Sequence, residues 1–517
     1  ELRSSSTLLL LAVLSVAALH SKAVRVDAAK SSSNSNGQGS TSVSGLGRPF
    51  QLLYREFVRL AAMLSFSRQL TLDDIRALVI GAMWLPDISW ILVGTAVRVA
   101  TERGLHLSYN KLPSSSNRGS PVVAMTPTNA ALPGSSSVAS TPLPAVAETQ
   151  QVWYQEARLY YVIYLVDHHA AIPHGRPPMT RQHSVIRHAS EWLSRCSCNT
   201  LIGLRSPDQR LISHTRLWEI MHDLIDLAGT DVNKPLDADS VELNSNFESQ
   251  LKRWLDETLF RTSLLFSGKE VDSELDQVKV VHSFAYLFLT SSAFRTPVGA
   301  LPDFIALSTA SSPSSTAQQL ILRKRHMAER AMATSLTLIG ALNSSGQPDN
   351  PKLHGAALRF APAWMYSMLV SSLVFAVKVH EMLDANHCPH LLQDCSSDKT
   401  IDALTAAVRE LESVAESVSE HHIVRKILDG AKALVRQMET IKRNEQSRDF
   451  MAAEPESSFS AAQPPDGMAQ FDLLSDFHQI SGLDFWPEIA MDGAAAGTGD
   501  DMPTGIDAYL ATIFNAG

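Results

Sequence analysis

The stretch SWILVGTAVRVATERGLH, residues 89–106, is the most informative part of this sequence. Its apolar residues recur at the spacing of one helical face, namely Trp90, Val93, Val97 and Ala100. Ala96, Ala100 and Gly104 repeat at every fourth position, which lets a neighbouring backbone come close. Gly104 also suits the left-handed position just past a helix end. The stretch therefore predicts a mostly buried helix that ends near Gly104.

The same stretch carries one polar stripe. Thr95, Arg98 and Glu102 lie three and four residues apart, so they share a narrow face of the helix. Arg98 and Glu102 are predicted to form an ion pair across one turn. These features describe a core helix and do not by themselves distinguish a regulator from another helical protein.

Helical periodicity extends through most of the chain. The predicted helices cover about 50–66, 71–84, 87–105, 148–172, 209–229, 243–264, 273–294, 316–343, 358–384 and 400–443. Residues 159–166 have the aromatic and β-branched content of a strand, but they sit in a long segment without Gly or Pro, which favours helix. The sequence predicts an all-α fold without a regular repeat.

Composition divides the chain into segments. Residues 27–48 and 113–147 are rich in small and polar residues and lack periodic apolar positions, so we expect disordered insertions there. Twelve of the 53 acidic residues lie in 449–517, which holds no Lys or Arg, whereas the preceding 44 basic and 41 acidic residues nearly balance. The predicted order is an N-terminal helix of the regulatory body (1–26), a low-complexity linker (27–48), the first part of the body (49–112), an insertion (113–147), the second part (148–448) and an acidic disordered tail (449–517).

Bulk properties indicate a large intracellular globular protein. The chain has 517 residues, of which 45% are hydrophobic and 19% charged. Its four cysteines, Cys196, Cys198, Cys388 and Cys395, are too few and too unevenly spaced for a disulfide scaffold, which favours a reducing compartment.

Two apolar runs raise the alternative of a secreted or membrane-associated protein. Residues 8–19 follow Arg3 and imitate a secretory signal, but the chain begins with Glu1 instead of Met and the run is too short to span a bilayer. Residues 361–377 contain Pro362 and are flanked by charges. We predict buried helices for both runs and no membrane partner.

A second informative block lies near residue 160. Large aromatic residues line one predicted helix, namely Trp153, Tyr154, Tyr160, Tyr161 and Tyr164. Pro173 ends this helix, and the turn HGRPP at 174–178 follows.

The two blocks, in this order and with an insertion between them, resemble the central regulatory domain of fungal zinc-cluster transcription factors. The residues that carry the resemblance are Ser89, Trp90, Gly94, Arg98, Gly104, His106, Asp167, Gly175, Arg176 and Pro177. The likeness is close over 85–181 and loose over about 7–385. One departure is Leu159-Tyr160-Tyr161, where many members have Leu-Trp-Trp, and this bears on the subfamily.

The resemblance implies an all-helical middle homology region that controls RNA polymerase II transcription in the nucleus. DNA binding in this family comes from a six-cysteine module with two zinc ions, and no such cluster occurs here. We therefore expect zinc and DNA contacts only in a cluster outside this chain, and no cofactor within it. The basic residues Arg323, Lys324, Arg325, His326 and Arg330 fit a nuclear localisation signal, although a solvated helix face is favoured.

The acidic tail predicts an activation segment. Its large apolar residues stand among acids, namely Phe471, Leu473, Leu474, Phe477, Leu483, Phe485 and Trp486. Acid repulsion keeps such side chains available until a coactivator groove buries them. Residues 507–514 are a candidate second docking element, and the alternative is a tail that only adds solubility.

Enzyme and metal alternatives rest on short motifs. Asp167, His168 and His169 match the Asp-His-His motif of metal-dependent phosphoesterases, but no upstream aspartate-rich loop accompanies them. We expect Asp167 and one histidine to cap or pack at a helix end, and the chain not to be an enzyme. A zinc site from Cys196 and Cys198, or from His387, Cys388, His390 and Cys395, matches no closed spacing.

Two further partners follow from the sequence. The near-heptad spacing of apolar residues over 401–438 is compatible with a homodimer, although packing on the body is favoured. Arg98, His106 and Arg176 place polar groups beside apolar faces and form a candidate pocket for a small-molecule effector, with buried structural pairing as the alternative.

Overall fold

The computed structural model confirms the all-α prediction. It describes residues 6–21, 49–67, 70–112, 144–172, 176–182, 184–195, 205–228, 234, 238–266, 269–296, 300–306, 315–342, 358–392 and 396–452. Every regular element in these ranges is a helix. The insertions at 27–48 and 113–143 and the tail beyond 452 lie outside the described residues.

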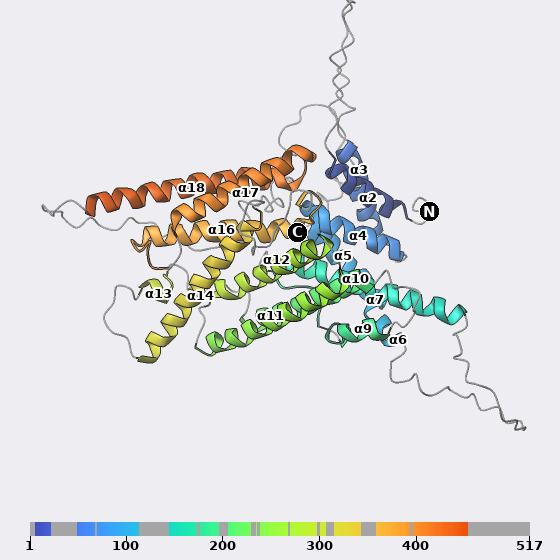
Figure 1. Ribbon diagram of the computed structural model, residues 1–517. Coiled ribbons are helices and arrows are strands. Elements are labelled where there is room, and N and C mark those ends of the chain that lie inside the picture. The colour runs from blue at the N-terminus through green and yellow to red at the C-terminus, as the bar shows by residue number, and fades with distance from the viewer. Residues whose placement is uncertain are drawn as a thin grey trace, which may run out of the picture.

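The N-terminal helices form one end of the molecule (Figure 1). They are α2 (Thr7–Leu19), α3 (Pro49–Leu64), α4 (Leu72–Trp84), α5 (Ser89–Glu102) and α7 (Pro144–Ala171). Helix α2 packs on α3 and α4, α4 packs on α5, and α5 packs on α7. Short elements join or flank them, namely η1 (Pro86–Ile88), η2 (Leu105–Leu107), α6 (Ser108–Lys111), α8 (Ser184–Arg187) and α9 (Ala189–Arg195).

Capping residues set where α2 and α4 begin and tie the two helices together. Thr71 caps α4 by accepting from the Asp74 amide at 3.1 Å, and Asp74 accepts from the Thr71 amide at 2.9 Å. Ser6 caps α2 by accepting from the Leu9 amide, and its hydroxyl donates to Asp74 Oδ1 at 2.7 Å. Residues 8–19 are thus a helix docked on the body.

Two glycines explain how α5 is held. A Cβ on Gly81 of α4 would lie 2.7 Å from both Leu92 Cδ1 and Phe57 Cζ, so α3, α4 and α5 meet closely at this point. Gly104 has a φ of 71°, which confirms the predicted left-handed position after α5.

Most of the remaining long helices extend the body away from the N-terminal group, whereas α10 lies beside α7 (Figure 1). They are α10 (Arg205–Ala228), α11 (Ala238–Leu265), α12 (Lys269–Ser291), α14 (Ser315–Gly340), α16 (Ala363–Ala385), α17 (Ser397–Ser417) and α18 (Ile423–Ala452), with η6 (Ser292–Phe294) and α13 (Asp303–Ala306) between them. Helix α10 packs on α7 and α11, and α12 packs on α11 and α14.

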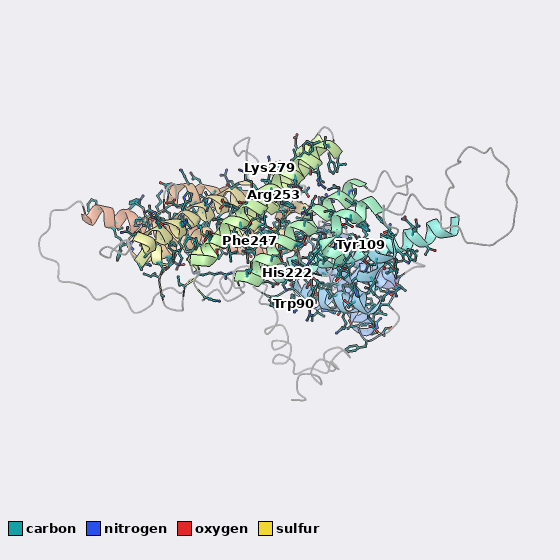
Figure 2. The ribbon with its side chains drawn as sticks, turned by 90° about the horizontal axis from the view of Figure 1, so that it is seen from below. Trp90, Tyr109, His222, Phe247, Arg253 and Lys279 are labelled. Carbon is teal, nitrogen blue, oxygen red and sulfur yellow. The ribbon has the colours of Figure 1, made fainter. Side chains whose placement is uncertain are left out.

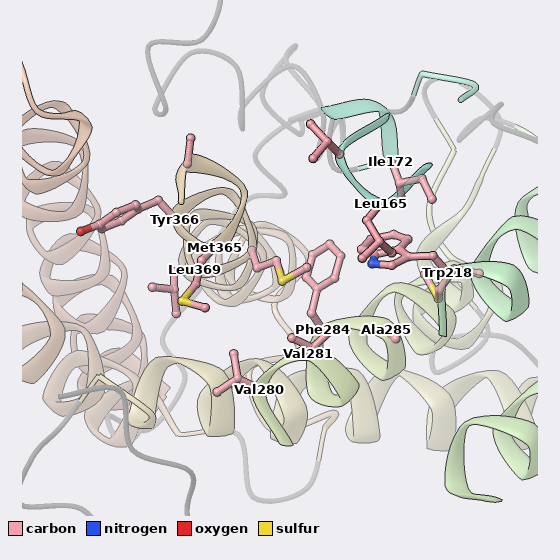
Figure 3. Close-up of a cluster of buried hydrophobic side chains, with 14 of the residues drawn as sticks. Leu165, Ile172, Trp218, Val280, Val281, Phe284, Ala285, Met365, Tyr366 and Leu369 are labelled. Carbon is pink, nitrogen blue, oxygen red and sulfur yellow. The ribbon is translucent and has the colours of Figure 1, made fainter. Parts of the chain in front are cut away.

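Helix α16 lies at the centre of the body. Eighteen of its 23 residues are buried, and it packs against α4, α12, α14, α17 and α18. Figure 3 shows Met365 of α16 and Phe284 of α12 directed into the same interior space as Leu165 and Trp218. The helix is long and apolar enough to cross a bilayer, but 83% of its most apolar window is buried within the protein. The predicted core helix is confirmed.

Two helix boundaries differ clearly from the sequence prediction, whereas residues 159–166 are helical as expected. Helix α7 begins at Pro144, inside the segment assigned to the insertion, and residues 159–166 lie within it as helix. The predicted helix 400–443 is two helices, because the chain reverses between Ser417 and Ile423. The reversal is held by tertiary contacts, since the Ser419 amide donates to the Leu19 carbonyl at 3.1 Å.

The reversal allows α17 and α18 to pack on each other. Leu404, Leu411 and Val414 of α17 and Leu434 and Met438 of α18 are buried inside the body. The near-heptad pattern is therefore used within the chain, as the favoured alternative predicted.

We expect Phe375→Ala to lower the free energy of unfolding by roughly 3–5 kcal/mol, because it leaves a cavity in the centre of α16. Phe375 is fully buried and meets Phe294 edge to face at 5.4 Å. Urea unfolding followed by circular dichroism measures the change. The matched control is Phe260→Ala, whose side chain is 66% exposed. Equal losses in the two variants would contradict the core position of α16.

Candidate functional site

The family-motif residues of α5 form a structural junction. The Ser89 hydroxyl donates to the Ala82 carbonyl at 2.8 Å and so joins the start of α5 to α4. Thr95 is buried, whereas Arg98 and Glu102 are exposed. Both charged side chains lie on the exposed face of α5, and an ion pair between Arg98 and Glu102 stays a prediction.

The structure brings the two motif blocks together. The guanidinium of Arg176 lies over the Trp90 ring at 5.1 Å, and a Cβ on Gly94 would lie 3.4 Å from Met179 Sδ. The Arg176 amide donates to the Ala171 carbonyl at 3.0 Å, so the chain turns back at the end of α7. Pro177 is exposed beside this turn, and Gly175 lies outside the described residues.

Asp167, in the last turns of α7, stabilises this junction. It is fully buried, and its Oδ2 accepts from the Thr180 amide at 2.6 Å and from the Thr180 hydroxyl at 2.7 Å. Burial raises the pKa of Asp167, and the two hydrogen bonds from Thr180 offset part of that effect. Asp167 therefore fixes the loop that carries Arg176 and Met179 against α5.

The three residues of the predicted effector pocket have different neighbours. Arg98 is exposed on α5, the half-buried His106 ring lies 6.0 Å from the Tyr160 ring, and Arg176 covers Trp90. Figure 2 shows Trp90 and Tyr109 at the N-terminal end of the body. An effector pocket at these residues stays a prediction.

The Asp-His-His motif is divided among three separate contacts. Asp167 binds Thr180, while His168 Nδ1 lies 2.8 Å from the Tyr164 carbonyl and His168 Nε2 lies 3.0 Å from His222 Nδ1. His169 stacks on Trp364 of α16 with ring centroids 4.1 Å apart. Each residue thus has a packing or capping role at the end of α7, as the alternative to metal binding predicted.

Burial dominates the electrostatics of these histidines. It lowers the pKa of His168 to about 3 and that of His169 well below its usual value. Both ring nitrogens of His169 are buried without a hydrogen-bond partner. His169 therefore behaves as a neutral aromatic side chain that joins α7 to α16.

The predicted cysteine sites are only partly within the described chain. Cys196, Cys198 and Cys395 lie outside it, and Cys388 is partly buried with its thiol 3.6 Å from the Leu383 carbonyl. Within the described ranges, no group of three or more His, Cys, Asp or Glu side chains is arranged to hold a metal ion.

The basic face of α14 is largely ion-paired. Lys324 is buried and binds Asp303 at 2.8 Å, Arg325 contacts Glu329 at 3.3 Å, and Arg330 pairs with Glu248. These contacts favour a structural helix surface over a free basic signal. The activation-segment residues from Phe471 to Trp486, and residues 507–514, lie outside the described residues.

Sequence reasoning missed a cavity of about 370 Å³ between α11, α12 and α14. Its lining residues are Val241, Glu242, Asn244, Ser245, Glu248, Leu289, Thr290, Arg323, His326, Met327 and Arg330. They come from three helices, of which α11 and α12 follow each other directly in the chain, and only the basic run at 323–330 gave a local signal. The cavity is lined by three buried apolar side chains and by charged side chains of both signs.

Comparisons with known proteins address the class of the chain. Residues 1–256 match the family described as "Fungal specific transcription factor domain". The "Transcriptional activator of proteases prtT" of Emericella nidulans is 30% identical over 254 residues, which are 49% of this chain and 29% of that protein. The alignment thus covers under a third of the relative. No solved structure matches the chain.

We expect Asp167→Ala to destabilise the protein by about 2 kcal/mol, because the buried Thr180 amide loses its acceptor. Asp167→Asn is the matched control, since an amide oxygen still accepts from Thr180, and we expect it to cost under about 1 kcal/mol. Urea midpoints measure both changes. An Asp167→Ala variant as stable as the parent would show that the anchor contributes nothing.

We expect His169→Phe to weaken the acid sensitivity of the fold. The unfolded chain protonates this histidine below about pH 6.5 and the native protein does not, so stability is full above that pH and falls as the pH drops. Between pH 7.5 and 5.5 the variant is expected to lose about 1.4 kcal/mol less of its unfolding free energy than the parent. The difference arises over the roughly one pH unit in which only the unfolded parent chain binds a proton at residue 169.

Urea unfolding at the two pH values measures this difference. His326→Phe is the control, because the His326 side chain is 68% exposed, whereas His169 is buried. An unchanged loss of stability in His169→Phe would contradict the burial of a neutral His169.

Proposed function

Because this chain belongs to the fungal specific transcription factor family through residues 1–256, we propose that it is the regulatory region of a nuclear activator of RNA polymerase II transcription. The family and the activator relative support transcription regulation as the function class. The matched region is the middle homology region of zinc-cluster transcription factors, which are not enzymes. The observation that carries the proposal is the family match of residues 1–256, just under half of the chain. The remainder of the chain includes a strongly acidic tail.

The acidic tail is proposed to act by recruitment. Residues 449–517 carry twelve acidic and no basic residues, with Phe471, Phe477, Phe485 and Trp486 among them. Acids keep such aromatics in solvent until a coactivator groove buries them. The partners that we propose are therefore transcriptional coactivators.

The helical body is proposed to gate this tail. Helix α18 is the last element of the body and leads directly into the tail, and α16 and α17 pack against it. A change in the body is thus connected to the tail through one continuous helix. A homodimer and an effector at Arg98, His106 and Arg176 stay predictions.

DNA binding is proposed to come from a zinc cluster outside this chain. That cluster is also proposed to be where zinc is bound. The four cysteines present do not follow the closely spaced six-cysteine pattern of such a module. Because the relative from Emericella nidulans is a transcriptional activator of proteases, protease genes are the first target class to examine. Nuclear localisation follows as part of the same proposal.

The tail proposal is tested by fusing residues 449–517 to an unrelated DNA-binding domain and measuring reporter transcription. We expect activation well above the DNA-binding domain alone. Replacing Phe471, Phe477, Phe485 and Trp486 by Ala should remove most of it, because the docking groups are lost while the acidic charge stays.

The matched control replaces four alanines of the same tail by Ser, which preserves charge and aromatic content. A fusion that does not activate, or one whose activity survives loss of the aromatics, would overturn the recruitment mechanism. Comparing the tail alone with residues 1–517 in the same assay tests gating, since the intact body is expected to lower the output.

A further inference from the structure

The cavity between α11, α12 and α14 has an apolar floor. Val241, Leu289 and Met327 contribute buried side chains from the three helices. Asn244 and Thr290 are also buried there, and the Asn244 amide donates to Ser292 Oγ at 3.2 Å. The floor can therefore receive an apolar group of a ligand, while the polar side chains beside it restrict how that group lies.

One wall of the cavity is a polar network of Glu248, Tyr286 and Arg330. Glu248 Oε1 accepts from the Tyr286 hydroxyl at 2.8 Å and pairs with Arg330, whose guanidinium lies 6.0 Å from the centre of the Tyr286 ring. Burial raises the pKa of Tyr286 to about 12, so its hydroxyl stays a donor to Glu248. Because the charges of Glu248 and Arg330 neutralise each other, this wall bounds the cavity but carries no net charge.

The mouth of the cavity carries one free charge of each sign. Glu242 of α11 and Arg323 of α14 are both exposed, and neither forms an ion pair within the part of the chain that the structure describes. His326 is exposed as well, but it already faces Glu329 at 3.5 Å. The two unmatched groups at the mouth are thus a carboxylate and a guanidinium on different helices.

A ligand with a single charge would pair with one of these two groups and would be repelled by the other. A ligand with both charges matches both, and an apolar side chain would fill the floor. The volume of about 370 Å³ lies at the lower end of the usual range for small-molecule sites, about 300–1,000 Å³. This size suits an amino acid or a peptide of very few residues.

We propose that the cavity between α11, α12 and α14 binds a small zwitterion with an apolar side chain, an α-amino acid or a short peptide. Arg323 holds the carboxylate of the ligand, Glu242 holds its ammonium group, and Val241, Leu289 and Met327 contact its side chain. The site lies outside the proposed pocket at Arg98, His106 and Arg176. It is independent of how the tail acts.

Calorimetric titration of the chain 1–517 tests the site, with leucine and leucyl-leucine as probes. Isocaproate and isoamylamine share the branched apolar group but carry only one charge each. We expect at least one zwitterion to bind at least tenfold more tightly than both of them, because each charged contact is worth about one order of magnitude in affinity. Comparing the two zwitterions identifies an amino acid or a peptide as the ligand.

Variants at the mouth assign the contacts. Arg323→Ala and Glu242→Ala are each expected to weaken binding about tenfold, since each removes one charge match. Arg253→Ala and Glu257→Ala are the matched controls, because both residues are exposed on α11 and neither lines the cavity. Ser245→Trp changes an exposed residue at the mouth and is expected to block entry without disturbing the core.

The proposal is overturned if neither zwitterion binds, if a singly charged probe binds as tightly, or if Arg323→Ala and Glu242→Ala leave the affinity unchanged. These outcomes are measured without transcription. Failure of the tail to activate a reporter would therefore leave this result untouched, and the reverse also holds.

Discussion

The burial of helix α16 determines how the long helices around it pack. This helix is apolar on nearly all sides, so it can exist in water only when other helices cover every face. Helices α4, α12, α14, α17 and α18 supply that cover.

The same constraint joins the family-matched half of the chain to the half beyond it. The Trp84 indole donates to the Phe360 carbonyl at 3.2 Å, Arg359 donates to the His20 carbonyl at 2.8 Å, and His169 stacks on Trp364. Each contact links residues within 1–256 to the segment that leads into α16 or to α16 itself. The packed helical body is therefore larger than the matched domain and includes α18.

Much of this architecture was predictable from periodicity, and the exceptions have physical reasons. The helices around Trp90, Tyr161 and Val374 were predicted because their apolar residues recur without Gly or Pro interruptions. The reversal at 418–422 was not, because no Gly or Pro marks it and contacts with Leu19 hold it. The cavity was missed because its charges come from separate helices, and the junction of Arg176 with Trp90 depends on the buried anchor at Asp167.

Native-state hydrogen exchange of the chain 1–517 tests most directly whether α16 unites the two halves into one body. If the halves depend on the same core, the slowest amides in the middle of α7 and of α16 open with the same free energy, within about 0.5 kcal/mol. The two free energies should also fall together as urea is added. An α7 that stays protected under conditions in which α16 already exchanges freely would contradict the account, because the matched half would then fold without its central helix.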